Sequence, residues 1–155
     1  MKLNFLIIIA IFAFFLALTF QTAEAQSTKN ISTKEASLIA HIAKEANQPG
    51  SHSEGDLYLL IKIGKTEYIV EFKSGKVVSQ RNAEIAGGGI CGYYTEVSVN
   101  LLNKSRKETA QGAGQVLKSS GGKWKMIALS EGDYFCDKLK GISKSVMRCL
   151  KAGCF

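Results

Sequence analysis

The stretch LYLLIKIGKTEYIVEFKSGKVVS, residues 57–79, carries the clearest secondary-structure pattern in the chain. Apolar residues alternate with other residues along 57–63 and again along 68–72, which is typical of strands that have one strongly apolar face. The dipeptides Gly64-Lys65 and Ser74-Gly75 separate the apolar runs and supply turn residues. The stretch therefore predicts a β-meander.

A helix is expected before this meander, over Thr33–Asn47. Ser32 stands three residues before Glu35, the spacing of a capping box. Asn47-Gln48-Pro49-Gly50 supplies a stop signal at the other end. Between these signals one apolar stripe follows at helical spacing, made of Ala36, Ile39, Ile42, Ala43 and Ala46.

Further strands are expected after the meander. A glycine-rich connection at 87–92 predicts a bulge or sharp bend before a long strand, Tyr93–Leu102. A glycine-interrupted strand over 109–119 and a returning strand over 123–130 follow, and 142–151 has the apolar spacing of a short helix. The fold class predicted is α+β, with an N-terminal helix packed on a curved antiparallel sheet and a short, disulfide-tied C-terminal helix. We expect one domain over 32–155, preceded by a flexible segment at 26–31.

The hairpin sequence VLKSSGGKWKMI, Val116–Ile127, resembles the closing hairpin of NTF2-like and cystatin-like domains, where a tight turn leads into a G-x-W-x-hydrophobic strand. The resemblance implies a helix lying across a curved sheet. In NTF2-like enzymes it also implies acid–base residues inside a cone-shaped pocket. The chain departs from the NTF2-like plan in two ways. Only one clear helix precedes the sheet, and residues 131–155 follow the hairpin. No aspartate occurs between residues 57 and 130, although a tyrosine or glutamate could serve instead, so no catalytic residue is carried over.

The first 25 residues have the three parts of a secretory signal peptide. Lys2 gives a positive start, residues 6–18 are apolar, and Ala23-Glu24-Ala25 is a small-x-small cleavage pattern before Gln26. The apolar run is too short for an ordinary membrane span, and no second run follows, so we expect no transmembrane segment after cleavage. The sequence therefore predicts a secreted or periplasmic protein.

Four cysteines follow the predicted cleavage site, and an even number in a small exported domain predicts two disulfides. Three connectivities are possible, and the sequence leaves all of them open. No C-x-x-C pair is present, and both histidines lie far upstream, so neither a metal nor another cofactor is expected. The predicted disulfide residues are Cys91, Cys136, Cys149 and Cys154.

The formal net charge of +7 is concentrated in the last third of the chain. Eight bases and eight acids cancel over residues 26–100, whereas eleven bases face four acids over 101–155. Such a surface can attract an acidic protein, a polyanion or an anionic envelope surface, although it can also be a solubilising lysine face. The bases stand mostly singly, so no nucleic acid is expected. The candidate binding residues are Lys123, Lys125, Lys138, Lys140, Lys144, Arg148 and Lys151.

Other polar and aromatic residues suggest less specific roles. His41 in the helix and His52 in a serine-rich loop could act as acid and base if they converged on one cleft. The aromatic residues Tyr93, Tyr94, Trp124, Tyr134 and Phe135 could line a binding surface, although aromatics in a small domain are usually core. Four charged residues are expected to form a solvated cross-strand ion-pair face, namely Lys62, Lys65, Glu67 and Glu71.

These observations favour a small exported, disulfide-bonded binding protein without catalysis, which uses a basic C-terminal surface. The alternative is a small secreted enzyme with an NTF2-like pocket or a His41/His52 hydrolase site. The partner's identity, the oligomeric state and glycosylation at Asn30 or Asn103 stay open in the sequence.

The predicted signal peptide has a direct test. If the chain is cut after Ala25, the exported product will have the intact mass of a chain that begins at Gln26. Mass spectrometry of the culture medium or periplasmic fraction measures this. A mature protein that still carries Met1 contradicts the prediction.

Overall fold

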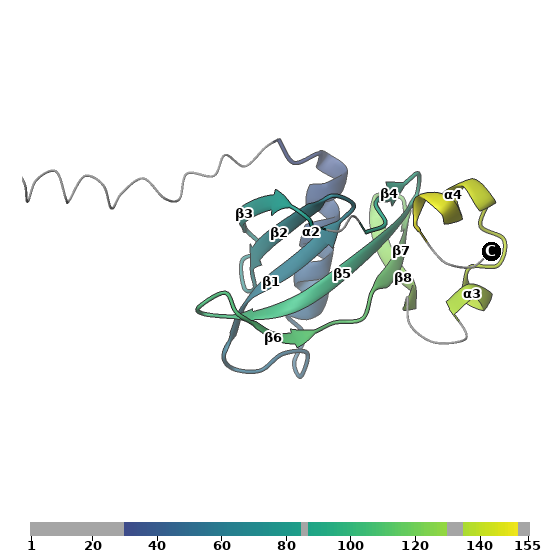
Figure 1. Cartoon of the computed structure of the whole chain (residues 1–155). Helices are drawn as coiled ribbons and strands as arrows, with labels where there is room; N and C mark the ends of the chain where they lie inside the picture. The colour runs from purple at the N-terminus through teal and green to yellow at the C-terminus, as the bar shows by residue number, and fades with distance from the viewer. Residues whose placement is uncertain (1–29, 85–86, 130–134, 152–155) are drawn as a thin grey trace, which may run out of the picture.

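The computed structural model describes residues 30–84, 87–129 and 135–151, which form a mixed α+β structure. One antiparallel sheet of eight strands is at its centre, with the main path β3-β2-β1-β5-β7-β8, and both β4 and β6 pair with β5 (Figure 1). None of the helices within these ranges is long and apolar enough to cross a membrane. The elements are α2 (Thr33–Ala46), β1 (Asp56–Ile63), β2 (Thr66–Glu71), β3 (Val77–Asn82), β4 (Ile90–Cys91), β5 (Tyr94–Asn103), β6 (Glu108–Gln111), β7 (Gln115–Ser120), β8 (Lys123–Leu129), α3 (Phe135–Lys138) and α4 (Lys144–Cys149).

The predicted capping box begins α2. The Ser32 hydroxyl accepts a hydrogen bond from the Glu35 amide at 3.2 Å, and the Ser32 amide donates to Glu35 Oε2 at 3.0 Å. The Tyr68 hydroxyl donates to Glu35 Oε1 at 3.0 Å and so ties the start of α2 to β2. Burial raises the pKa of the Glu35 carboxyl, but the hydrogen bonds from Ser32 and Tyr68 outweigh it and leave the pKa below its usual value. Burial and the neighbouring Glu35 raise the pKa of Tyr68 to about 12.

The main core lies between α2 and one face of the sheet. Leu59 and Ile61 of β1 are fully buried there, as the alternation predicts. The apolar stripe of α2 differs from the prediction, because Ala36 is exposed and Leu38 is fully buried instead. The buried face of α2 is thus turned toward β8. On that side Trp124 is buried, and its Nε1 donates to Ser37 Oγ at 3.0 Å.

Two strands replace the single strand expected over 109–119. The segments β6 and β7 pair with different parts of β5, and the chain between them turns at Gly112, whose amide donates to Val99 O at 3.0 Å. A Cβ at Gly112 would collide with that carbonyl oxygen, so the break requires glycine. An irregularity in the sheet also exposes Leu57, which the alternation predicts to be buried, because the β1–β5 register shifts between Asp56 and Tyr58.

A second core lies on the opposite face, because Val116 and Leu117 are neighbours in β7 and point to opposite sides of the sheet. The short helix α4, together with Leu139 after α3, packs on this face at one end of the sheet. The helix expected over 142–151 is the shorter α4, with Ser143 as its N-cap, and α3 was not expected. The second core consists of Cys91, Val116, Ala128, Leu139, Met147 and Leu150.

A disulfide between Cys91 and Cys149 joins β4 to α4 and links residues 58 positions apart. Cys136 is also disulfide-bonded, which agrees with the prediction of disulfides in this chain. Cys154 lies outside the described residues. The segment 26–31 is described only from Asn30 onward, so its expected flexibility stays a prediction.

The Cys91–Cys149 disulfide is expected to stabilise the fold. Replacing both residues (Cys91→Ala with Cys149→Ala) should lower the free energy of unfolding by about 3–4 kcal/mol, mainly because a long loop in the unfolded chain is released. Urea denaturation of the variant and the wild type under oxidising conditions measures the difference. Equal free energies of unfolding contradict the assignment, and a non-reducing peptide map of the wild type serves as the control for the Cys91–Cys149 link.

Candidate functional site

Basic and aromatic side chains form one row across four strands on the sheet face away from α2. Cys91 of β4 is opposite Tyr94 of β5, Tyr94 is opposite Lys118 of β7, and Lys118 is opposite Lys125 of β8. Directly opposed residues of antiparallel strands share a face. The Lys118 ammonium lies 5.5 Å from the centroid of the Tyr94 ring. Two lysines placed directly opposite each other repel, so the row is a place where an anionic group gains free energy.

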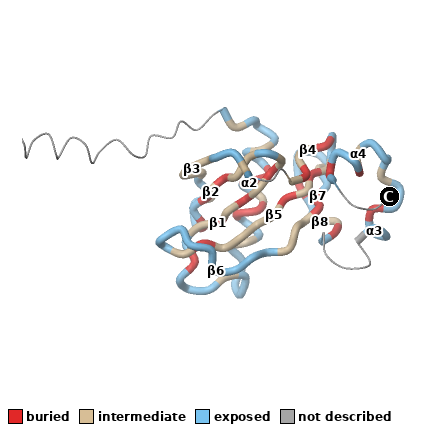
Figure 2. Tube along the Cα trace, in the orientation of Figure 1, coloured by how far each residue is buried: buried red, intermediate tan, exposed pale blue. Residues whose placement is uncertain are grey.

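The disulfide brings the bases of α4 next to this row. Cys149 is bonded to Cys91, and the neighbouring Arg148 is exposed, as are Lys144 and Lys151. Figures 1 and 2 show α4 beside β4, with much of its outer surface exposed. We call the row and the α4 bases together the basic surface; it comprises Tyr94, Lys118, Lys125, Lys144, Arg148 and Lys151.

The remaining predicted bases surround the basic surface less closely. Lys123 is exposed at the start of β8, two residues before Lys125. Lys138 is exposed at the end of α3, and Lys140 forms an ion pair with Asp137 at 2.8 Å. Lys118 was missed at the sequence level, although a two-residue turn at Gly121-Gly122 already places it opposite Lys125.

The predicted aromatic residues fall into different environments. Trp124 belongs to the main core, and Tyr94 is half-buried beneath Lys118. Tyr93, by contrast, is 70% exposed at the tip of the β4–β5 hairpin. Tyr134 and the side chain of Phe135 lie outside the described part of the chain.

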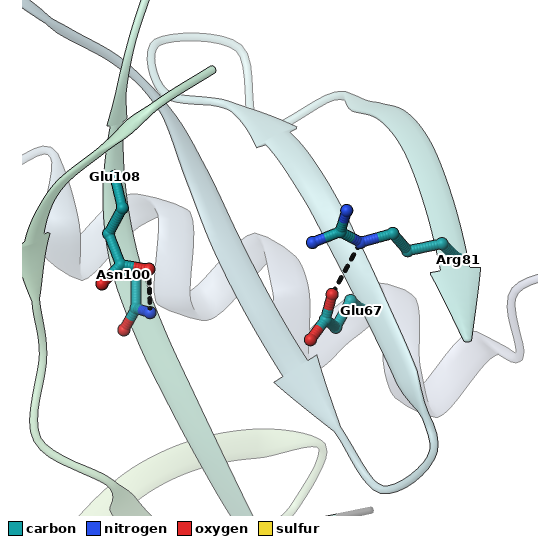
Figure 3. Close-up of polar contacts among 4 residues, drawn as sticks. All are labelled: Glu67, Arg81, Asn100 and Glu108. Carbon is teal, nitrogen blue, oxygen red and sulfur yellow. Dashed lines mark hydrogen bonds and ion pairs between the residues drawn. The ribbon is translucent and has the colours of Figure 1, made fainter. Parts of the chain in front are cut away.

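A polar depression of about 740 Å³ occupies the uncovered part of the same sheet face. Figure 3 shows its two main contacts: Arg81 Nε lies 2.7 Å from Glu67 Oε2, and Asn100 Nδ2 donates to Glu108 Oε2 at 2.9 Å. Of the four residues expected to form a cross-strand ion-pair face, Glu67 has a described ion pair, and its partner Arg81 was not among those expected. Lys62 is opposite Glu67 in the register, but the ion pair described for Glu67 is with Arg81 on β3.

The other two residues of that expected face lie elsewhere. Glu71 accepts a hydrogen bond from the Ser74 hydroxyl within the β2–β3 turn. Lys65 is exposed in the β1–β2 turn and borders a separate small hollow at the start of α2. Two carboxylates of the polar depression, Glu67 and Glu108, thus have partners within the sheet itself.

Glu96 is the half-buried carboxylate of this depression. Burial raises its pKa, and the hydrogen bond from the Gly88 amide and the charge of Lys151 reduce that effect without cancelling it. A Cβ at Gly88 would collide with Glu96 Oε2 and with the carbonyl oxygen of Leu150. The glycine-rich connection therefore lets the backbone pass between β5 and the end of α4, in addition to turning at Gly92, where φ is +64°.

The two histidines line different depressions. His41 borders a groove of about 740 Å³ between α2 and β5, β7 and β8, which has Val99 and Trp124 among its apolar lining residues. His52 lies in another hollow, where its ring is 4.2 Å from that of Phe72 and its buried Nδ1 has no hydrogen-bond partner among the described residues. No depression described here is lined by both histidines. Within the described ranges, no three potential metal ligands form a group.

Comparison with models of protein families, with curated proteins and with solved structures finds no match to this chain. The function is therefore argued from the geometry of the site.

The raised pKa of Glu96 predicts a pH-dependent stability effect. The folded state binds the Glu96 proton more tightly than the unfolded state, so ionisation of Glu96 destabilises the fold as pH rises from 4.5 through the folded-state pKa. Glu96→Gln should raise the urea midpoint at pH 7, because a neutral amide can still accept the Gly88 hydrogen bond. The gain should disappear near pH 3, where the wild-type carboxyl is protonated in both states.

The matched control is Glu84→Gln, because Glu84 borders the same depression but is exposed. This variant should leave the urea midpoint nearly unchanged at both pH values. A Glu96→Gln protein that is less stable than the wild type at pH 7 contradicts the assignment.

Proposed function

We propose that the protein is an exported, non-catalytic binding protein whose basic surface holds an anionic partner, with a polyanion as the best-fitting class. The observation that carries the proposal is the direct opposition of Lys118 and Lys125 on β7 and β8. Like charges on directly opposed residues of neighbouring strands destabilise a sheet, and a bound anion offsets that cost.

The distribution of charge on the two halves of the sheet supports this proposal. In the polar depression, Glu67 is paired with Arg81, and Glu108 accepts a hydrogen bond from the Asn100 amide. Over residues 115–155 eight bases accompany three acids, and one of those acids, Asp137, is already paired with Lys140. This excess of positive charge can attract a polyanion, an acidic protein or an anionic envelope surface.

Export and the finer fold assignment are parts of the same proposal. The three-part N-terminal pattern supports secretion or periplasmic localisation, and disulfides are typical of oxidising compartments. We further propose a cystatin-like or NTF2-like arrangement, which is supported by α2 packed across one sheet face and by the β7–β8 hairpin with its buried Trp124.

The groove beneath α2 favours a second candidate, a small enzyme that uses an NTF2-like pocket. His41 borders this groove together with Glu45 of the same helix, and the interior contains the apolar side chains of Val99 and Leu101. The proposal of binding without catalysis is preferred because the groove brings His41 together with neither His52 nor any cysteine.

The binding proposal predicts a loss of affinity when the lysine pair is neutralised. Lys118→Gln with Lys125→Gln should weaken binding to heparin or to anionic liposomes by about ten- to thirtyfold at low salt, since each lysine near an anionic surface contributes ~1 kcal/mol. The affinity of the wild type should also fall as ionic strength rises. Salt-dependent retention on heparin and liposome co-sedimentation measure both effects.

The control carries the same change of charge at the other end of the sheet. Lys73→Gln with Lys76→Gln neutralises two exposed lysines around the β2–β3 turn and should reduce binding at most about twofold. Equal losses of affinity in the two double variants would show that binding depends on net charge alone and would contradict the assignment of the basic surface. Absence of wild-type binding at low salt overturns the polyanion proposal.

A further inference from the structure

We propose that the tip of the β4–β5 hairpin is the point where the protein recognises an acidic polysaccharide, with a sugar ring lying on Tyr93 and the carboxylates or sulfates of the polymer meeting the neighbouring lysines. This inference rests on the proposed function, because it names the partner class of the basic surface. It adds to that function a residue with no charge.

Tyr93 is the most exposed large side chain of the described residues that is not a charged or amide residue. It occupies a two-residue turn with Gly92, between the paired residues Cys91 and Tyr94. With 70% of its surface exposed, it contributes little to either core. An aromatic ring in this position offers a flat apolar face to a ligand and a hydroxyl to water.

The turn is held in place although the ring is exposed. The Ser119 amide donates to Tyr93 O at 2.7 Å, and the Lys34 ammonium donates to Gly92 O. The Cys91–Cys149 disulfide fixes the hairpin immediately before the turn. A ligand that stacks on Tyr93 therefore meets a backbone that is already ordered, which lowers the entropic cost of binding.

Lysines approach the hairpin tip from both faces of the sheet. The Lys34 ammonium, at the start of α2, lies 5.7 Å from the centroid of the Tyr93 ring. Lys118 lies over the ring of the adjacent Tyr94, and Lys125 follows in the same row. An anionic polymer that crosses the tip can thus meet positive charge before and after the exposed ring.

The chemistry of the tip favours a charged sugar polymer over other anions. Single-stranded nucleic acids are held by several aromatic rings on which successive bases stack, and here one ring is exposed at the tip while Tyr94 is half-buried. Insertion into a lipid surface requires apolar residues, but the neighbours of Tyr93 in the turn and in β7 are Gly92, Ser119 and Ser120. A polymer with anionic groups on flat rings uses both the lysines and Tyr93.

The test compares three polymers that share negative charge but differ in their rings: alginate, inorganic polyphosphate and oligo(dT). Tyr93→Ala should weaken alginate binding about fivefold, which is the size of effect expected for one aromatic contact, and should leave polyphosphate binding unchanged within about twofold. Tyr93→Phe should retain alginate binding. Lys118→Gln with Lys125→Gln should weaken binding of both alginate and polyphosphate.

The matched control is Tyr58→Ala, because Tyr58 also lies beneath a cation, with Arg106 5.6 Å from its ring centroid, but pairs with Glu71 and Leu102 away from the tip. After thermal denaturation has verified folding of each variant, Tyr58→Ala should bind alginate as the wild type does.

Three outcomes separate the possibilities. If Tyr93→Ala binds alginate as the wild type does, or loses equal affinity for alginate and polyphosphate, the inference is overturned. In that case a loss of binding in the lysine double variant still supports the proposed function. Tighter, Tyr93-dependent binding of oligo(dT) than of alginate overturns it in favour of nucleic acid. Failure of the wild type to bind any of the polymers at low salt overturns the proposed function and the inference together.

Discussion

The bond between Cys91 and Cys149 joins two parts of the chain that have little surface of their own to hold them. The strand β4 has two residues, and α4 has six. A helix of that length is not stable in isolation, so its position depends on the disulfide and on the small apolar cluster around Leu150 and Met147. The α4 portion of the basic surface, the passage of Gly88 beneath Leu150 and the rigid turn at Tyr93 all follow from this link.

On the sheet surface opposite α2, the arrangement of charged residues differs between β1, β2 and β3 on one side and β7 and β8 on the other. On β1, β2 and β3, acids and bases alternate across neighbouring strands, as in the row formed by Lys62, Glu67 and Arg81. On β7 and β8, the lysines stand opposite one another without an acidic neighbour in the register. One half of the sheet thus places opposite charges next to each other, and the other half places like charges opposite each other. A net charge of +7 alone does not show this separation.

Local patterns predicted the parts of the structure that local forces determine. The alternation in residues 57–72 and the capping box at Ser32 predicted β1, β2 and the start of α2, because side-chain period and hydrogen-bonding groups act over a few residues. The exchange of Ala36 for Leu38 in the buried stripe could have been predicted, since Leu38 is the larger apolar residue and lies four residues before Ile42, at helical spacing. The ion pair of Glu67 with Arg81 depends on the register of β3 against β2, which shifts between Ile69 and Val70.

The candidate site was also predictable only where local sequence determines it. Its bases and cysteines were identified from the sequence, and the lysine pair could have been derived from the glycine turn at residues 121–122. The pairing of Cys91 with Cys149 could not be derived, because distant contacts select one of three connectivities. The exposure of Tyr93 could not be predicted either, since an aromatic residue beside a buried strand usually belongs to a core.

The long span of the disulfide also imposes an order on the assembly of the molecule. The hairpins β1–β2 and β2–β3 join strands that are adjacent in sequence, and such local contacts form early in folding. The cluster around Leu150 has no such early start, and Val116 and Ala128 stay uncovered until the chain has been made through Cys149. A chain that lacks α4 therefore leaves one side of its sheet as an open apolar surface, and the Cys91–Cys149 disulfide holds in place the element that covers it.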